Sequence, residues 1–71
     1  MKFSIFVKEV RKQLGMSQEQ LANALNVSFS TINRWENSKT EPSNLAQKTF
    51  SDFCEGNLIK IPDNIRNNKS E

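Results

Sequence analysis

The sequence predicts an all-α fold, a compact four- to five-helix bundle that contains a helix-turn-helix. Four segments of the chain carry apolar residues at helical spacing. Two of them, between Ser17 and Pro42, are joined by a turn too short for any arrangement other than a helix-turn-helix. A chain of 71 residues that is 35% hydrophobic holds one small domain with a modest core. The helix-turn-helix makes duplex DNA the leading candidate partner.

The first predicted helix covers residues 4–14. Its apolar stripe consists of Ile5, Phe6, Val10 and Leu14. Gly15 follows, and glycine is a favourable left-handed cap at a helix C-terminus. We therefore expect this helix to end there and to pack one face against the rest of the bundle.

The two helices of the motif are predicted at residues 17–25 and 28–37. Ser17 and Gln20 have the spacing of a capping box, in which each side chain satisfies a free backbone amide at the helix start. Asn26 lies in the turn, where asparagine tolerates the left-handed conformation. The apolar positions expected to face a shared core are Leu21, Ala22, Leu25, Val27, Ile32 and Trp35.

A fourth helix is predicted after a polar loop, with Pro42 in its first turn and its end near Cys54. Gly56 and Asn57 are expected to stop it. Its amphipathic face is formed by Leu45, Ala46, Thr49, Phe50 and Phe53.

A tail at residues 57–71 is expected to follow a helix-turn-helix domain at residues 1–56. The tail first carries apolar residues around Pro62, and its polar end is expected to be disordered. Three arrangements fit this pattern: an extended arm, a helical turn, or a contact between two copies of the chain. The apolar residues concerned are Leu58, Ile59, Ile61 and Ile65.

Composition excludes several classes of protein. No apolar run approaches the roughly 20 residues needed to cross a bilayer, and the charged start does not resemble a signal sequence, so we expect a cytoplasmic protein without a membrane partner. Histidine is absent and Cys54 is the single cysteine, which leaves no catalytic pair and no zinc site. We therefore expect a buried Cys54, no metal, no cofactor, no small-molecule substrate and no enzymatic activity.

The net charge of +2 and the sequence pI of about 8.9 are modest, so the distribution of charge matters more than its total. Lys8, Arg11 and Lys12 cluster in the first predicted helix. Arg34 and Lys39 lie near the end of the second motif helix. This distribution is compatible with a basic patch, although acidic residues are interspersed throughout.

The stretch VRKQLGMSQEQLANAL runs directly into NVSFSTINRWENSKTEPS. In this pattern, residues 6–54 resemble the lambda-repressor-like (Cro/Xre-type) helix-turn-helix family of phage and bacterial regulators. The positions that match the family are Gln18, Leu21, Ala22, Val27, Ile32, Trp35, Glu36 and Pro42. The resemblance implies a transcriptional regulator, in particular a repressor, whose third helix lies in the major groove while the second crosses above it.

Four residues are candidates for reading bases. A helix with its side chains is about 10 to 12 Å across and the major groove is about 12 Å wide, so a helix fits. With the core positions of the third helix turned inward, helical spacing places Phe29, Ser30, Asn33 and Arg34 outward. Arg34 suits guanine or a phosphate, Asn33 suits adenine or a phosphate, and Phe29 suits a thymine methyl group. Ser30 discriminates little, and Phe29 also suits an apolar contact with a partner chain or the fourth helix.

The resemblance implies phosphate contacts on both sides of the groove, from Gln18 before it and from Asn37 and Lys39 after it. Free backbone amides at the start of the second helix attract a phosphate as well. Ser28 is expected mainly to cap the third helix, with a phosphate contact as a secondary role. Taken alone, Lys39 is compatible with an ordinary solvated surface charge.

The resemblance further implies a partly buried ion pair between Arg11 and Glu36, which fixes how the first helix meets the third. Arg11 is then a structural residue and not a DNA contact. Two features depart from the family: Ser38 stands where glycine is common, and the tail differs from the fifth helix through which many such repressors dimerise. A homodimer therefore stays a candidate, and its recognition helices are expected about 34 Å apart.

A second function is compatible with the same bundle. It is a protein-interaction or antitoxin-like adaptor that uses Phe29 or residues 58–65 as an apolar anchor. The two functions differ in their response to salt, because DNA affinity falls steeply as salt rises, whereas an apolar contact barely responds.

Overall fold

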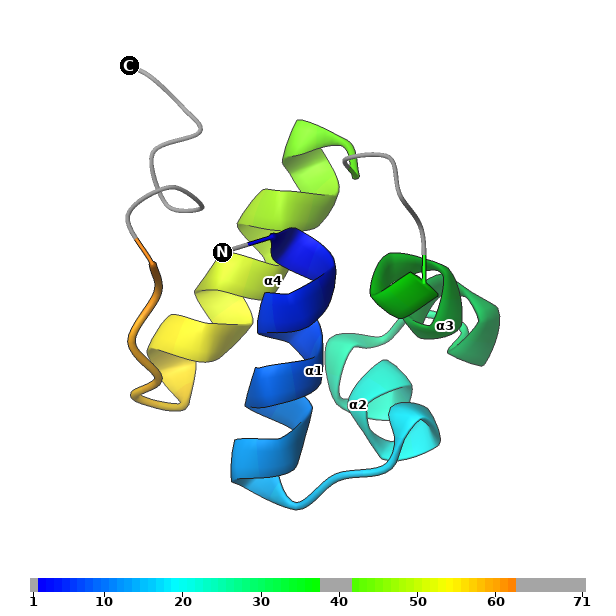
Figure 1. Ribbon diagram of the computed structural model, residues 1–71, viewed down its shortest axis with the longest axis horizontal. Helices are drawn as coiled ribbons and strands as arrows, with labels where there is room; N and C mark the ends of the chain where they lie inside the picture. Colours follow the sequence, from blue (N-terminus) through cyan, green and yellow to red (C-terminus); the bar gives the residue numbers. More distant parts are fainter. Residues whose placement is uncertain (1, 38–41, 63–71) are drawn as a thin grey trace.

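The computed structural model describes residues 2–37 and 42–62, and this part of the chain contains four helices and no strand. The helices are α1 (Phe3–Leu14), α2 (Gln18–Leu25), α3 (Phe29–Asn37) and α4 (Asn44–Gly56). In Figure 1, α1 runs through the middle of the molecule, with α2 and α3 on one side and α4 on the other. The all-α fold predicted from the sequence is confirmed.

The core is organised around the ring of Phe50, which is fully buried on α4. Phe3 and Phe6 of α1 meet this ring edge-on, each with centroids 5.5 Å away, and Trp35 of α3 does so at 6.1 Å. Edge-to-face aromatic pairs add to the free energy gained by burial alone. The aromatic cluster therefore fastens α1, α3 and α4 together. The other fully or nearly fully buried apolar residues are Val7, Val10, Leu21, Ala22, Ile32, Cys54 and Ile61.

Two residues predicted to face the core do not. Ile5 is 48% exposed and Leu45 is 74% exposed. Ile5 lies five residues before the fully buried Val10, and Leu45 lies five residues before the fully buried Phe50. Five residues along a helix make one full turn plus about 140°, so the two side chains of each pair point in very different directions. Neither side chain can therefore share the face of that buried residue. The positions of α1 that are buried are Phe3, Phe6, Val7 and Val10.

The local signals around the motif are confirmed. Ser17 Oγ accepts a hydrogen bond from the Gln20 backbone N–H at 3.0 Å, and Gln20 Oε1 accepts one from the Ser17 backbone N–H at 2.8 Å. Gly15 and Asn26 both adopt the left-handed conformation, with φ of 66° and 60°. Gly15 and Asn26 end α1 and α2 within a single position each, and Asn26 thereby keeps the turn before α3 short.

The fourth helix begins later than predicted. Ser43 is its N-cap, and the Ser43 Oγ accepts a hydrogen bond from the Ala46 backbone N–H at 3.1 Å. Pro42 precedes this cap and does not form part of the first turn. The serine takes the capping position because it carries a side-chain acceptor, which proline lacks.

The fourth helix ends at Gly56 with Asn57 as its C-cap, so the expected stop at these two residues is confirmed, two residues beyond Cys54. The left-handed residue beyond them is Leu58, with φ of 59°. The Ile59 backbone N–H then donates to the Cys54 carbonyl at 2.9 Å, as in a Schellman motif. Residues 58–62 continue without helix, and Ile61 is buried against the core with 4% of its surface exposed. Ile65 lies outside the described residues.

Candidate nucleic-acid interface

The third helix has two chemically different sides. Ile32, Trp35 and Glu36 are buried. The outer face of α3, which we define as Phe29, Ser30, Asn33 and Arg34, is exposed, and 52% of the Phe29 surface is accessible. All four candidate base-reading residues therefore lie together on the open side of one helix.

Hydroxyl groups gather at the start of α3. The Ser28 Oγ accepts a hydrogen bond from the Thr31 backbone N–H at 3.1 Å, which is the geometry of an N-cap. The same oxygen lies 2.9 Å from Thr31 Oγ1 and 3.2 Å from Ser30 Oγ. Ser28 thus caps the helix, as the sequence indicates, while its hydroxyl remains at the exposed helix N-terminus.

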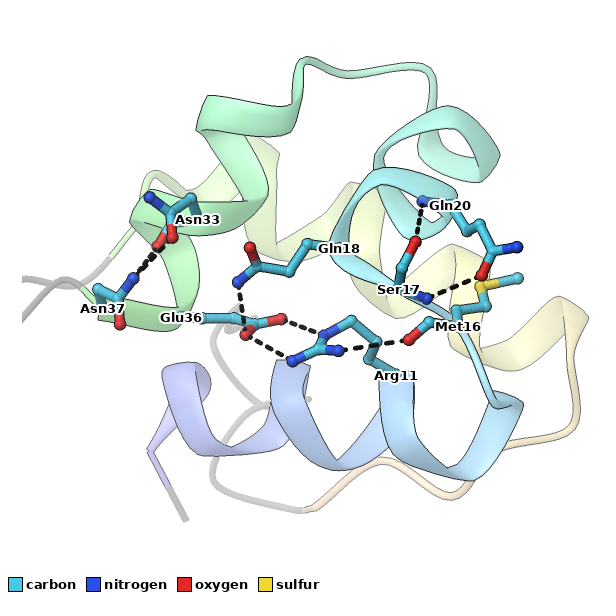
Figure 2. A network of polar contacts seen from close by, with 8 residues as sticks. All are labelled: Arg11, Met16, Ser17, Gln18, Gln20, Asn33, Glu36 and Asn37. Carbon is cyan, nitrogen blue, oxygen red and sulfur yellow. Dashed lines mark hydrogen bonds and ion pairs between the residues drawn. The ribbon is translucent and has the colours of Figure 1, made fainter.

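Asn33 and Asn37 form a side-chain pair one helical turn apart. The Asn37 Nδ2 donates to the backbone carbonyl of Asn33 at 2.9 Å and to Asn33 Oδ1 at 2.8 Å (Figure 2). An amide nitrogen carries two hydrogens, so these two bonds engage both donors of Asn37. The phosphate contact implied for Asn37 requires its amide to leave Asn33.

The expected ion pair between Arg11 and Glu36 is present. Arg11 donates from Nε to Glu36 Oε2 at 2.8 Å and from Nη2 to Glu36 Oε1 at 3.1 Å. Gln18 Nε2 adds a hydrogen bond to Glu36 Oε1 at 2.9 Å, and Arg11 Nη1 donates to the Met16 carbonyl at 3.3 Å. Figure 2 shows how these side chains from α1, α2 and α3 converge on one carboxylate. The network fixes the start of α2 and the end of α3 relative to α1.

The charges of this pair are maintained by their surroundings. Burial disfavours the ionised form of Glu36 and by itself raises its pKa, and it is the largest single influence. The hydrogen bonds from Arg11 and Gln18, with the positive charges of Arg11 and Lys8, outweigh burial and leave the pKa below its ordinary value. In turn, the hydrogen bond to Glu36 raises the pKa of Arg11 against the opposing effect of burial. Both partners are therefore charged at neutral pH.

The residues expected to contact phosphates differ in how many of their hydrogen-bond donors are already used within the chain. Gln18, the first residue of α2, uses one amide hydrogen for Glu36, which leaves its second amide hydrogen as a donor. Ser28 lies at the start of α3, and Asn37 is engaged with Asn33. Lys39 and Ser38 lie outside the described residues.

Sequence reasoning missed two contacts in this region. The Asn33 and Asn37 pair has an i, i+4 spacing, which is a sequence signal for side-chain contact on a helix and was sufficient to find it. The bond between Gln18 and Glu36 joins two helices, and no local spacing indicates it.

The single cysteine does not belong to this exposed surface. Cys54 is fully buried on α4, where burial, assisted by the charge of Glu55, raises the pKa of its thiol to about 12. Within residues 2–37 and 42–62, no three acidic, cysteine or histidine side chains gather closely enough to hold a metal ion. None of the helices in this part of the chain has the length and apolar character of a membrane span.

The short turn between two packed helices, with an exposed polar face on the second, defines the class of helix-turn-helix DNA-binding domains. A family model for the helix-turn-helix matches residues 7–45, which is more than half of the chain. The chain belongs to this family, in its Cro/C1-type branch.

A curated relative is similar to most of the chain. The chain is similar to the Type II methyltransferase M1.ScrFI of Lactococcus lactis subsp. cremoris, with 47% identity over 55 residues. The alignment covers 73% of this chain and 14% of the methyltransferase, so the chain spans only a small share of that enzyme's length. No solved structure is significantly similar to the chain.

Proposed function

We propose that the chain is a sequence-specific, double-stranded DNA-binding transcriptional regulator that inserts α3 into the major groove and represses by occupying its operator. The observation that carries this proposal is the outer face of α3. Its four residues are exposed while the opposite side of the same helix is held in the core. A helix held in this way has the width and the freedom to enter the groove.

The outer face offers chemically distinct contacts to bases. Arg34 is the residue best suited to guanine, because a guanidinium donates two parallel hydrogen bonds to O6 and N7. Phe29 suits a thymine methyl group, and Ser30 suits several bases. Each good bidentate contact contributes about 1 to 3 kcal/mol of discrimination.

Phosphate contacts are proposed around this face. Gln18 and the free amides at the start of α2 approach one strand, and Ser28 approaches it from the start of α3. Lys39 is proposed for the other side of the groove, where a phosphate contact by Asn37 competes with the hydrogen bonds of Asn37 to Asn33. Arg11 is excluded from this set because Glu36 and Met16 engage its guanidinium.

We propose that the regulator acts as a homodimer and without catalysis. The part of the tail proposed for the contact between two copies is Leu58, which is 94% exposed, together with residues beyond 62. Ile61 is unavailable for this contact because it is buried in its own chain. The similarity to a methyltransferase covers too small a share of that enzyme to support methyl transfer here.

Selection of bound sequences from a pool of random duplexes tests the proposal. We expect the wild-type chain to enrich a defined sequence. For Arg34→Ala, loss of preference at one base position would assign Arg34 to a base, and a uniform loss of affinity would assign it to a phosphate. No enrichment and no binding at low ionic strength would contradict the proposed function.

A second candidate is a protein-interaction or antitoxin-like adaptor. Two exposed apolar side chains favour it, Phe29 at 52% and Leu58 at 94% exposure. Titration in increasing salt separates the two functions. Counterion release gives DNA binding a slope of about −0.9 in log K against log salt for each phosphate contact, whereas an apolar protein contact shows almost none.

A further inference from the structure

We propose that Asn37 turns Asn33 into a hydrogen-bond donor toward DNA, so that Asn33 selects a keto base, guanine or thymine, over an amino base, adenine or cytosine. This inference rests on the proposed function, because it requires α3 to lie in the major groove. It concerns the side-chain pair at the exposed end of α3, where neither residue belongs to the core.

The hydrogen bonds fix which way both amides face. The backbone carbonyl oxygen of Asn33 can only accept, so the Asn37 atom 2.9 Å from it must be the donor Nδ2. The same Nδ2 lies 2.8 Å from the Asn33 side chain, whose facing atom must then be the acceptor Oδ1. The chemistry of a single backbone oxygen therefore determines the orientation of both side chains.

Asn33 consequently presents its nitrogen to the outside. Its Oδ1 is occupied by Asn37, and its Nδ2 lies on the far side of the amide from Asn37 (Figure 2). No residue in the described part of the chain accepts a hydrogen bond from this Nδ2. Its two hydrogens are available to a partner in solution.

The two kinds of base edge respond differently to such a donor. Asparagine pairs with adenine by donating to N7 while its carbonyl oxygen accepts from the amino group N6. Here the Asn33 Oδ1 already accepts a hydrogen bond from Asn37. That bond neutralises part of the negative partial charge on the oxygen, so a second hydrogen bond from the adenine amino group is weaker. Guanine offers O6 and N7, and thymine offers O4, so a keto base provides acceptors only. The amino group of adenine or cytosine in the same place would face the N–H groups of Asn33, and two donors cannot form a hydrogen bond with each other.

The pair also reduces the cost of ordering Asn33. Asn37 is four residues further along the helix, so its side chain stands directly beside that of Asn33. Two hydrogen bonds hold the amides before DNA arrives, which lowers the conformational entropy that binding must remove. Asn37 is therefore a positioning residue that acts through Asn33.

Selection from random duplexes with four variants tests this inference. The wild-type chain is expected to prefer guanine or thymine over adenine by about fivefold or more at one position, and Asn33→Ala is expected to remove that preference. Asn37→Ala frees the carbonyl oxygen, so adenine should rise to within about twofold of the preferred base. Asn23→Ala, an exposed asparagine on α2 without a side-chain hydrogen bond in the structure, is the matched control and should leave the profile unchanged.

A fourth variant, Asn37→Asp, reverses the pair. A carboxylate can only accept, so Asn33 should donate to it and turn its own carbonyl oxygen outward. The preference at the Asn33-dependent position should then move to adenine or cytosine, and the added negative charge should weaken binding to all duplexes. Because both asparagines are exposed, each variant should keep the circular dichroism spectrum of the wild type.

The outcomes separate this inference from the proposed function. A wild-type preference for adenine at the position lost in Asn33→Ala would overturn the inference, as would an unchanged profile in Asn37→Ala and Asn37→Asp. Enrichment of a defined sequence without any position that depends on Asn33 would overturn it as well. Failure of the wild-type chain to enrich any duplex would contradict the proposed function itself.

Discussion

The inner and outer sides of α3 are formed by the same nine-residue helix, but the inner side is packed in the core and the outer side is exposed to solvent. On the inner side, Ile32 is fully buried, Trp35 packs against aromatic rings, and Glu36 is held by Arg11 and Gln18. On the outer side, Phe29 and Arg34 are open to solvent. A helix needs one fixed face so that the other can be presented rigidly. Substitutions on the two sides should therefore separate into effects on stability and effects on binding.

The largest expected effect concerns the inner side, through the partner of Glu36. Arg11→Ala leaves a carboxylate that is 2% exposed without its counter-charge, and such a change costs about 3 to 5 kcal/mol. Urea denaturation followed by circular dichroism measures this loss. Lys12→Ala, an exposed neighbour on α1, is the control and should change the free energy of unfolding by no more than about 0.5 kcal/mol. Equal stability of the two variants would show that the pair does not hold α1 against α3.

Acidification tests the same pair, because it protonates the Glu36 carboxylate and leaves both side chains in place. The pKa of Glu36 is lowered in the folded state, so its contribution to stability is present above the ordinary value of 4.5 and is lost as the pH falls through the lower folded value. The loss should be smaller than for Arg11→Ala, because a protonated carboxyl group still accepts hydrogen bonds. Urea midpoints measured from neutral pH down to about pH 3 should fall, and the fall should be shallower in Glu36→Gln, which does not titrate at this position. Identical slopes would contradict the assignment.

The next effect concerns the outer side. Arg34→Ala should weaken binding to the selected duplex by about 1 to 3 kcal/mol, because it removes the proposed bidentate base contact. Fluorescence anisotropy measures the affinity, and a thermal melt of the free variant should match the wild type because Arg34 is exposed. A fall in melting temperature of the size caused by Arg11→Ala would show that the two sides of α3 are not separable.

The smallest effect lies outside α3 and concerns Leu58. This residue adopts a left-handed conformation, with φ of 59°, while 94% of its side chain is exposed. Leu58→Gly should stabilise the monomer by about 0.5 to 1 kcal/mol, because relief of strain exceeds the added entropy of the unfolded chain. Chemical denaturation at low protein concentration measures this gain. Destabilisation that grows with protein concentration would instead identify Leu58 as part of the contact between two copies.

The sequence predicted what local rules control. The capping box of Ser17, the left-handed Gly15 and Asn26, and the inward positions Ile32 and Trp35 all follow from short spacings along the chain. The paired charges of Arg11 and Glu36 came from the resemblance to a family, because no spacing links residues so far apart.

The features that escaped prediction depend on competition between neighbours or on contacts between helices. Ile5 and Leu45 are apolar, but the core contacts the helix faces that Val10 and Phe50 occupy. Gly56 and Asn57 end α4 as expected, but the left-handed residue beyond them is Leu58 and not a glycine, which residue preference did not indicate. On the outer side, sequence alone placed Asn33 correctly, but the direction of its amide depends on Asn37.

The central claim is that the outer face of α3 contacts duplex DNA. Titration of the isotopically labelled chain with the selected duplex, followed by backbone amide chemical shifts, tests it most directly. We predict that the largest changes fall on Phe29, Ser30, Asn33 and Arg34 and at the start of α2, while the exposed side of α1 around Lys12 stays unchanged. Changes concentrated on α1 or α4 with an unaffected α3 would contradict the claim.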